Sequence, residues 1–290
     1  MAEFEAAGEE VELDEARVDA IRAAVDRRDS GEVSRLLEPL HAADIADLLE
    51  QISGAERREL LALWSGEIDG DVLSELDETI REEVIESLPP EVVAEAVRDL
   101  DTDDVVDILE DLEAPAQGKI LDALELVDRV AVEQAMSFPE GSAGRLMQRE
   151  VVVAPEHWTV GDAIDFLRGA KSLPDQFYHV ILVDPRMKPL GYVTLGRMLS
   201  ARRDVRLKDI AEESFRTVVA TEEEEEVAYI FNQYHLISCP VVDANDRLVG
   251  VITIDDAMNV LDEEHEEDML LLAGVGEEAS VLDGPIATVR

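Results

Sequence analysis

The sequence predicts a multidomain α+β chain, in which an all-helical N-terminal domain precedes two copies of a small α/β module. Three observations support this fold class. Apolar residues recur at three- and four-residue spacing through the first 137 residues, a strand-turn-strand-helix pattern then occurs twice, and a stretch rich in turn formers separates the two parts. The chain of 290 residues is long enough for such domains to have separate cores.

Residues 30–137 are expected to form short helices stacked as a superhelix, with residues 1–29 as an N-terminal extension. Val33, Leu37 and Leu40 show the helical spacing. Acidic residues and prolines before apolar runs mark helix starts, as at Pro89-Pro90-Glu91 and at Asp101 to Asp104. The turn formers of residues 138–146 predict a linker.

The repeated pattern defines the C-terminal half. Its first copy runs from His179 to Asp184 and then from Leu190 to Thr194, and its second from Cys239 to Asp243 and then from Leu248 to Asp256. Each copy has a short apolar strand, a turn built on Asp, a second strand containing Gly and a helix that starts after Thr. We expect modules over residues 147–208 and 209–264, followed by a connecting helix and tail over 265–290.

The composition constrains the partners. A formal charge of −44, from 69 acidic and 25 basic residues, argues against nucleic acid and favours cations. Adaptation to concentrated salt is a second explanation of the acidity, since only 4 of the basic residues are Lys. The single Cys239 cannot form an intramolecular disulfide, and neither a membrane-spanning stretch nor a signal peptide is visible, so a soluble cytoplasmic polypeptide is expected.

The order of these elements, with Gly191-Tyr-Val-Thr194 and Gly250-Val-Ile-Thr253, resembles a pair of CBS domains. With Ser142 to Met147, Ser87 to Pro90 and Leu100 to Asp104, the chain from Ser30 to Arg290 is similar to the cytosolic portion of the MgtE family of magnesium channels. The resemblance implies a homodimer formed through the CBS pair, at the cytoplasmic face of the membrane. It also implies a transmembrane pore domain as partner, which would begin near the point where this chain ends, and Mg²⁺ binding that compacts the domains and closes the pore.

Two acidic helix starts carry the metal prediction. Asp103 and Asp107 are four residues apart, so their carboxylates share one helix face about 5–6 Å apart and repel each other. A hard cation would relieve that repulsion, although capping of the helix is the simpler explanation. The resemblance makes Asp103, Asp104 and Asp107 magnesium ligands. It also places Asp256, beside Asp255, at a Mg²⁺ shared with the residue at Asp103, where capping is again the alternative.

Further carboxylates follow from the same resemblance. Glu264, Glu267 and Asp268 form one helical stripe within an acidic run and are expected to bind Mg²⁺ beside the connecting helix, with ordinary solvated charge as the alternative. Asp71 and Glu225 align with family residues at the domain interface and in the second module. His235 occupies the position of the carboxylate partner of Glu225, and a neutral imidazole is a poor Mg²⁺ ligand.

Nucleotide binding departs from the family pattern. Some members bind ATP through a Gly-x-x-Ser/Thr-x-x-Asp sequence in the first module, whereas this chain has Arg197 in place of the Asp. The change removes the ribose acceptor and argues against ATP, although Tyr178 and Thr194 remain candidates to line a nucleotide cleft. The alternative to a Mg²⁺ sensor is a CBS module that binds an adenine nucleotide and regulates another partner. The scattered His residues and the absence of a nucleophile elbow or Walker loop predict no enzyme.

Overall fold

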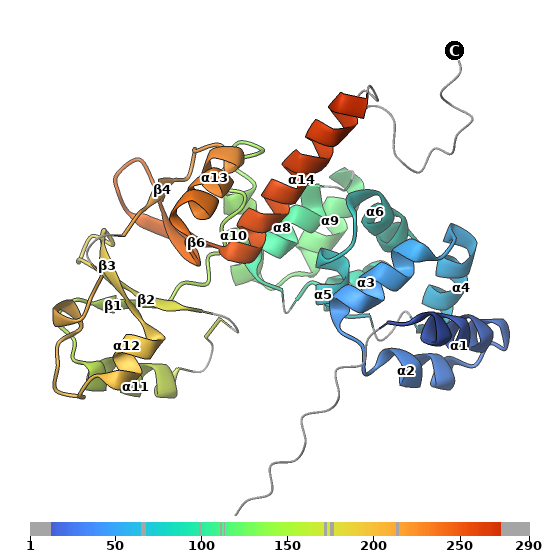
Figure 1. Ribbon diagram of the computed structural model, residues 1–290, viewed down its shortest axis with the longest axis horizontal. Helices are drawn as coiled ribbons and strands as arrows, with labels where there is room; N and C mark the ends of the chain where they lie inside the picture. The colour runs from blue at the N-terminus through green and yellow to red at the C-terminus, as the bar shows by residue number, and fades with distance from the viewer. Residues whose placement is uncertain are drawn as a thin grey trace, which may run out of the picture. The chain divides into compact units, whose positions relative to one another are not determined.

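The computed structural model describes residues 13–64, 68–98, 100–110, 112, 114–170, 173–174, 177–212 and 215–273. The chain divides into two compact units, Met1–Glu133 and Gln134–Arg290, and each is described by itself (Figure 1). The predicted fold class is confirmed, because a helical part precedes two small mixed sheets with helices.

Short helices make up the described part of the first unit. Their hydrophobic faces are buried against one another, and Leu48, Leu49 and Leu60 are almost fully inaccessible to solvent. The helices are α1 Glu15–Asp26, α2 Ser30–Leu37, α3 Ala42–Gln51, α4 Gly54–Trp64, α5 Gly70–Ser74, α6 Glu78–Ser87, α7 Pro90–Ala96, α8 Thr102–Glu110, α9 Ala114–Ala123 and α10 Leu126–Ala135, the last of which crosses the unit boundary.

Two features of this unit refine the sequence prediction. The segment expected to be an N-terminal extension contains α1, which lies beside α2 and α4 and buries Ile21, Ala24 and Val25. Pro90 occupies the first turn of α7, as the Pro-Pro-Glu pattern predicts, because its missing N–H is not needed there.

Two buried arginines connect successive helices of this unit. Arg57 on α4 donates to the carbonyls of Leu49 and Ile52 near the C-terminus of α3, and its guanidinium pairs with Glu83 on α6. Arg81 on α6 donates twice to the carbonyl of Leu76 and pairs with Asp107 on α8. These two connections, here called the Arg57 clamp and the Arg81 clamp, satisfy carbonyls that a helix end leaves without partners.

The second unit contains two three-stranded sheets, of strand order β1-β2-β3 and β4-β5-β6. In each sheet the first pair of strands is parallel, and the second pair is the antiparallel hairpin that the sequence predicts. The elements are β1 Val153–Pro155, α11 Val160–Gly169, β2 His179–Val183, β3 Pro189–Thr194, α12 Leu195–Ser200, the 3-10 turn η2 Leu207–Asp209, β4 Val218–Val219, α13 Glu224–Tyr234, β5 Ser238–Val242, β6 Leu248–Thr253 and α14 Ile254–Ala273.

The hairpin turns are built on Asp, as expected. The Oδ1 atom of Asp184 accepts hydrogen bonds from two backbone N–H groups of its turn, and Asp243 does the same in the second module. Met187 and Asp246 occupy equivalent places with positive φ angles of 63° and 59°. These backbone hydrogen bonds lower the pKa values of Asp184 and Asp243, so the ionised form of each carboxylate stabilises its turn.

The two modules exchange short segments. Gln148, at the start of the first module, pairs with Val251 of β6, whereas Glu212, near the start of the second, pairs with Tyr192 of β3. The segment expected to be a linker packs in the same crossed manner, since Ala143 belongs to the buried core of the second module and Phe138 packs against it, and Met147, the first residue of the first module, is buried in the same core. Each module therefore completes its sheet or core with residues from the start of the other module or from the segment just before it.

Candidate metal and nucleotide sites

The first acidic helix start lies on α8. Val105, Val106, Ile108 and Leu109 bury its apolar face. Asp103 is also buried, with 7% of its surface exposed, and its Oδ1 accepts the backbone N–H of Asp104 at 3.1 Å. Asp107 differs, because its side chain is 57% exposed while its Oδ2 lies 2.5 Å from Nη1 of Arg81. One candidate ligand of this helix is thus already part of a salt bridge.

The second acidic helix start lies where β6 passes into α14. The backbone N–H of Thr253 donates to Oδ2 of Asp256 at 3.1 Å, and the hydroxyl of Thr253 contacts carboxylate oxygens of both Asp255 and Asp256. A hydroxyl has one proton, so it can donate to only one of these two carboxylates at a time. Burial, with a smaller contribution from the charge of Asp255, raises the pKa of Asp256 to about 6, although the hydrogen bonds from Thr253 oppose that rise.

The remaining predicted ligands are more dispersed. Asp71 is exposed in the short helix α5, and Glu225 is exposed in the first turn of α13. His235 ends α13 in the left-handed conformation, with φ of 51°. Glu264, Glu267 and Asp268 fall within α14, as the helical stripe requires, but their side chains lie outside the described residues.

The structure brings the predicted ligands together in pairs and triplets along single elements. Asp103, Asp104 and Asp107 share α8 in the first unit, whereas Asp255 and Asp256 share the start of α14 in the second. Among the described residues there is no group of three or more His, Cys, Asp or Glu side chains arranged to hold a metal ion. A complete magnesium site formed by these residues would therefore need donors from more than one helix start, or water.

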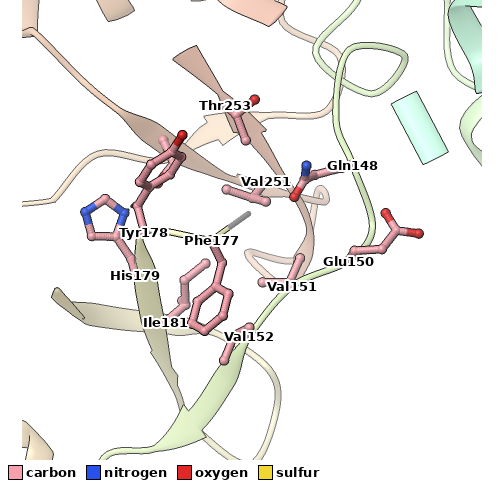
Figure 2. A pocket seen from close by; sticks show the side chains of 11 residues that line it. Gln148, Glu150, Val151, Val152, Phe177, Tyr178, His179, Ile181, Val251 and Thr253 are labelled. Carbon is pink, nitrogen blue, oxygen red and sulfur yellow. Dashed lines mark hydrogen bonds between the residues drawn. The ribbon is translucent and has the colours of Figure 1, made fainter. Parts of the chain in front are cut away.

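A pocket lies between the two modules of the second unit (Figure 2). Tyr178 and His179 line one side, and Val251 and Thr253 line the other. Of the two candidates for a nucleotide cleft, Tyr178 lines this pocket and Thr194 does not. The other lining residues are Gln148, Glu150, Val151, Val152, Phe177, Ile181 and Ser238.

Thr194 is the N-cap residue of α12. Its Oγ1 accepts the backbone N–H of Arg197 and caps α12, while Arg197 pairs with Glu212 at 2.5 Å. In the second module the equivalent Thr253 belongs to the pocket, and Asp256 follows it three residues later. The Thr-x-x-Asp pattern that is broken in the first module is thus intact in the second, where Asp256 is also one of the predicted magnesium ligands.

His179 joins the two modules at the edge of this pocket. Its Nδ1 lies 2.6 Å from Oγ of Ser238, the first residue of β5, and its ring lies 4.3 Å from that of Tyr192. His179 and Ser238 occupy equivalent positions, since they pair with Thr194 and Thr253 in their own sheets. Burial lowers the pKa of His179, which favours the neutral imidazole.

Two kinds of family model match the chain. The model of the CBS domain matches residues 143–204 and 207–263, which defines the second unit as a tandem CBS pair. The model of the MgtE intracellular N domain matches residues 40–141. With this combination of domains, the chain belongs to the MgtE family.

Curated relatives agree with this assignment. The chain is 33% identical over 154 residues to the magnesium transporter MgtE of Thermus thermophilus, and 27% identical over 156 residues to that of Bacillus subtilis. These matches cover 53% and 54% of this chain, but only 34% and 35% of the relatives. The chain therefore spans about a third of the length of these transporters, and their names describe no enzyme.

Solved structures show the same architecture. The soluble part of a magnesium transporter superposes with a TM-score of 0.74 at 23% identity, covering 86% of this chain and 98% of the other. The cytosolic domain of the Mg²⁺ channel MgtE in complex with ATP superposes with a TM-score of 0.74 at 29% identity, covering 84% of this chain and 99% of the other. In the described part of this chain, no helix combines the length and the apolar character needed to span a membrane.

Proposed function

We propose that this chain is the Mg²⁺-sensing regulatory part of a magnesium transporter or channel. Mg²⁺ would bind at acidic helix starts and at the interface of a homodimer, draw the two units together and close a pore in a transmembrane domain of the same transporter. Such a chain works at the cytoplasmic face of the membrane. The observation that supports this most is the pair of acidic helix starts, one in each unit, within a chain of charge −44.

Electrostatics provides the driving force. Asp103 and Asp104 in the first unit and Asp255 and Asp256 in the second are anionic groups on separate bodies, so they repel until a divalent ion joins them. Mg²⁺ prefers carboxylate oxygens and retains several waters, which suits sites with only one or two carboxylates from each side. Asp71, Asp107, Glu225, Glu264, Glu267 and Asp268 are the further proposed donors.

Weak sites are sufficient for such a switch. About four sites that each contribute roughly 1.4 kcal/mol sum to about 5.5 kcal/mol, which moves a two-state equilibrium from 1:99 to 99:1. Each site would then respond near millimolar Mg²⁺, and their combined effect would be steep.

The test is a Mg²⁺ titration followed by small-angle scattering and by limited proteolysis at constant ionic strength. The radius of gyration should fall and protease protection should rise with Mg²⁺, but not with an equal ionic strength of NaCl. Asp103→Asn and Asp256→Asn should each raise the Mg²⁺ concentration of half-maximal protection, whereas Asp165→Asn, a surface change away from both helix starts, should not. Identical scattering with and without Mg²⁺ would exclude the proposal.

The pocket favours a second candidate, an adenine-nucleotide-sensing CBS module. Tyr178 provides an aromatic face and Thr253 provides a hydroxyl group, and among the described residues that line the pocket there is no Lys or Arg. That composition suits a nucleoside better than its triphosphate. Calorimetry and small-angle scattering with ATP and with adenosine, each with and without Mg²⁺, separate the two candidates. Compaction that occurs only when nucleotide is added supports the second.

A further inference from the structure

We propose that Arg81 sets the strength of Mg²⁺ binding at the start of α8 by holding one oxygen of Asp107 with a fixed, buried positive charge. The inference rests on the proposed function, because it concerns the affinity of one of the proposed sites. Arg81 is a positioning residue in this account and contacts no ion itself.

The first step is the geometry of the Arg81 clamp. The guanidinium is 8% exposed, donates to the carbonyl of Leu76 through Nε at 3.2 Å and Nη2 at 3.0 Å, and reaches Oδ2 of Asp107 through Nη1. Leaving this position would deprive a buried carbonyl of its donors, which is costly. The positive charge therefore stays beside α8, since arginine is not deprotonated in proteins.

The second step is the effect of that charge on a divalent ion. Asp107 is 57% exposed and lies one helical turn from Asp103, so a cation can approach it from solvent. The cation then meets a carboxylate that Arg81 already neutralises in part. With water-like screening, one unit charge roughly 6 Å from a divalent ion changes its binding constant by about tenfold, and by less in salt.

The chain contains its own matched control. The Arg57 clamp has a similar construction 24 residues earlier, in which a buried arginine donates to backbone carbonyls and pairs with a carboxylate 26 residues later. It connects α4 with α6, and the acceptor Glu83 also pairs with Arg58 at 2.8 Å. Helix α6 carries none of the proposed magnesium ligands. A change at Arg57 therefore reproduces the structural loss without touching the proposed site.

The chain also indicates which substitution to use. Gln117 on α9 donates through Nε2 to the carbonyls of Leu109 and Leu112, both at 2.8 Å. These acceptors lie 8 and 5 residues before the donor, the same offsets as Leu49 and Ile52 before Arg57. Glutamine can thus bond such carbonyls without a charge. Arg81→Gln should keep much of the carbonyl bonding while it releases Asp107.

The experiment compares Mg²⁺ binding by calorimetry in the full chain, in R81Q, in R57Q and in the double variant R81Q/D107N, at one low ionic strength. R81Q should bind Mg²⁺ about three- to tenfold more tightly, while R57Q should stay within twofold of the parent. The melting temperatures of both single variants should fall by a similar amount. The gain of R81Q should disappear in R81Q/D107N, because the released carboxylate is then missing.

Equal Mg²⁺ affinities in R81Q and R57Q would overturn the proposal, and so would a gain that persists in R81Q/D107N. If R81Q does not fold, Arg81→Met replaces it, and failure of both to fold while R57Q folds would also overturn a tuning role. Scattering on the same samples separates the two levels. Tighter binding in R81Q without compaction of the parent by Mg²⁺ would support Arg81 tuning and reject the proposed function, whereas compaction with unchanged affinity would do the reverse.

Discussion

The hydroxyl of Thr253 lies 2.6 Å from Oδ2 of Asp256, at the point where the last strand of the second module becomes α14. The same hydroxyl also contacts Asp255, so two carboxylates converge on one proton donor. The hydrogen bonds from Thr253 do not fully offset the cost of burying the charged form of Asp256. The pKa of Asp256 is raised to about 6, and its ionised form is stabilised less by the protein than by water.

The first prediction concerns Asp256 and pH in the absence of divalent ions. The unfolded carboxyl ionises near pH 3.8, whereas the folded one holds its proton to about pH 6. Its contribution therefore lowers the free energy of unfolding between these values, by at most about 3 kcal/mol, and stays constant above them. Urea denaturation at pH 4.5 and 7.5 should show that the free energy of unfolding falls more between these two pH values in the parent than in Asp256→Asn. Equal losses would contradict the prediction.

The same titration should govern Mg²⁺. Because only the ionised carboxylate attracts a cation, Mg²⁺ binding that depends on Asp256 should weaken as the pH falls through 6. Calorimetry at pH 5 and 7.5 measures the change, and Asp256→Asn should remove most of it. A parent and a variant with the same pH dependence would show that other groups are responsible.

The second prediction concerns the His179–Ser238 hydrogen bond between the modules. Since burial lowers the pKa of His179, the stability gained from the neutral ring is present above the unfolded pKa near 6.5 and is lost as the pH falls below it. Ser238→Ala should cost about 0.5–1.5 kcal/mol of unfolding free energy at pH 7.5. Ser200→Ala, which removes an exposed hydroxyl bonded to the Arg197 carbonyl, is the control and should cost less.

The third prediction concerns the glycines beside the exchanged segments. A Cβ on Gly191 would lie 2.7 Å from the carbonyl oxygen of Glu212, and one on Gly250 would lie 2.6 Å from that of Gln148. Gly191→Ala and Gly250→Ala should each destabilise the fold by about 1–3 kcal/mol, because backbone must move. Gly196, within α12, has no atom near its Cβ position, so Gly196→Ala should be neutral or stabilising by up to about 1 kcal/mol. Denaturation curves in which Gly191→Ala and Gly250→Ala are as stable as Gly196→Ala would contradict the close packing of these glycines against Glu212 and Gln148.

The fourth prediction concerns Cys239. Burial raises the pKa of its thiol to about 12, so almost none is thiolate at pH 8. Alkylation by iodoacetamide should proceed only as fast as the second module opens, and it should become rapid in urea. Fast modification under native conditions, with unchanged scattering, would mean that Cys239 is accessible.

Much of this fold could be predicted because its signals are local. The Asp-based turns and the Pro90 helix start each depend on a few neighbouring residues, and both are present. The start of α13 was less well predicted. Glu223 precedes this helix without a side-chain cap hydrogen bond, and the backbone N–H of Glu224 donates to the carbonyl of Gly141, which is distant in the sequence.

The features that could not be predicted depend on contacts between distant residues. Residues 138–146 contain turn formers and look like a linker, yet Ala143 is fully buried in the core of the second module. Likewise, nothing in the neighbourhood of Asp107 indicates that a buried arginine 26 residues earlier holds it. Periodicity identifies which face of α8 is apolar, but the partners of its polar face depend on how the helices stack.

The crossed pairing of Gln148 and Glu212 has a consequence for how such a protein can be divided or evolve. Neither half of the tandem owns all the backbone that closes its sheet, so a gene split between the halves would yield two fragments with open edges. Those fragments should recover a native pair only when mixed. If the tandem arose by duplication of one ancestral module, that module would accordingly have formed a homodimer, in which each copy paired its first residues with the sheet of the other copy.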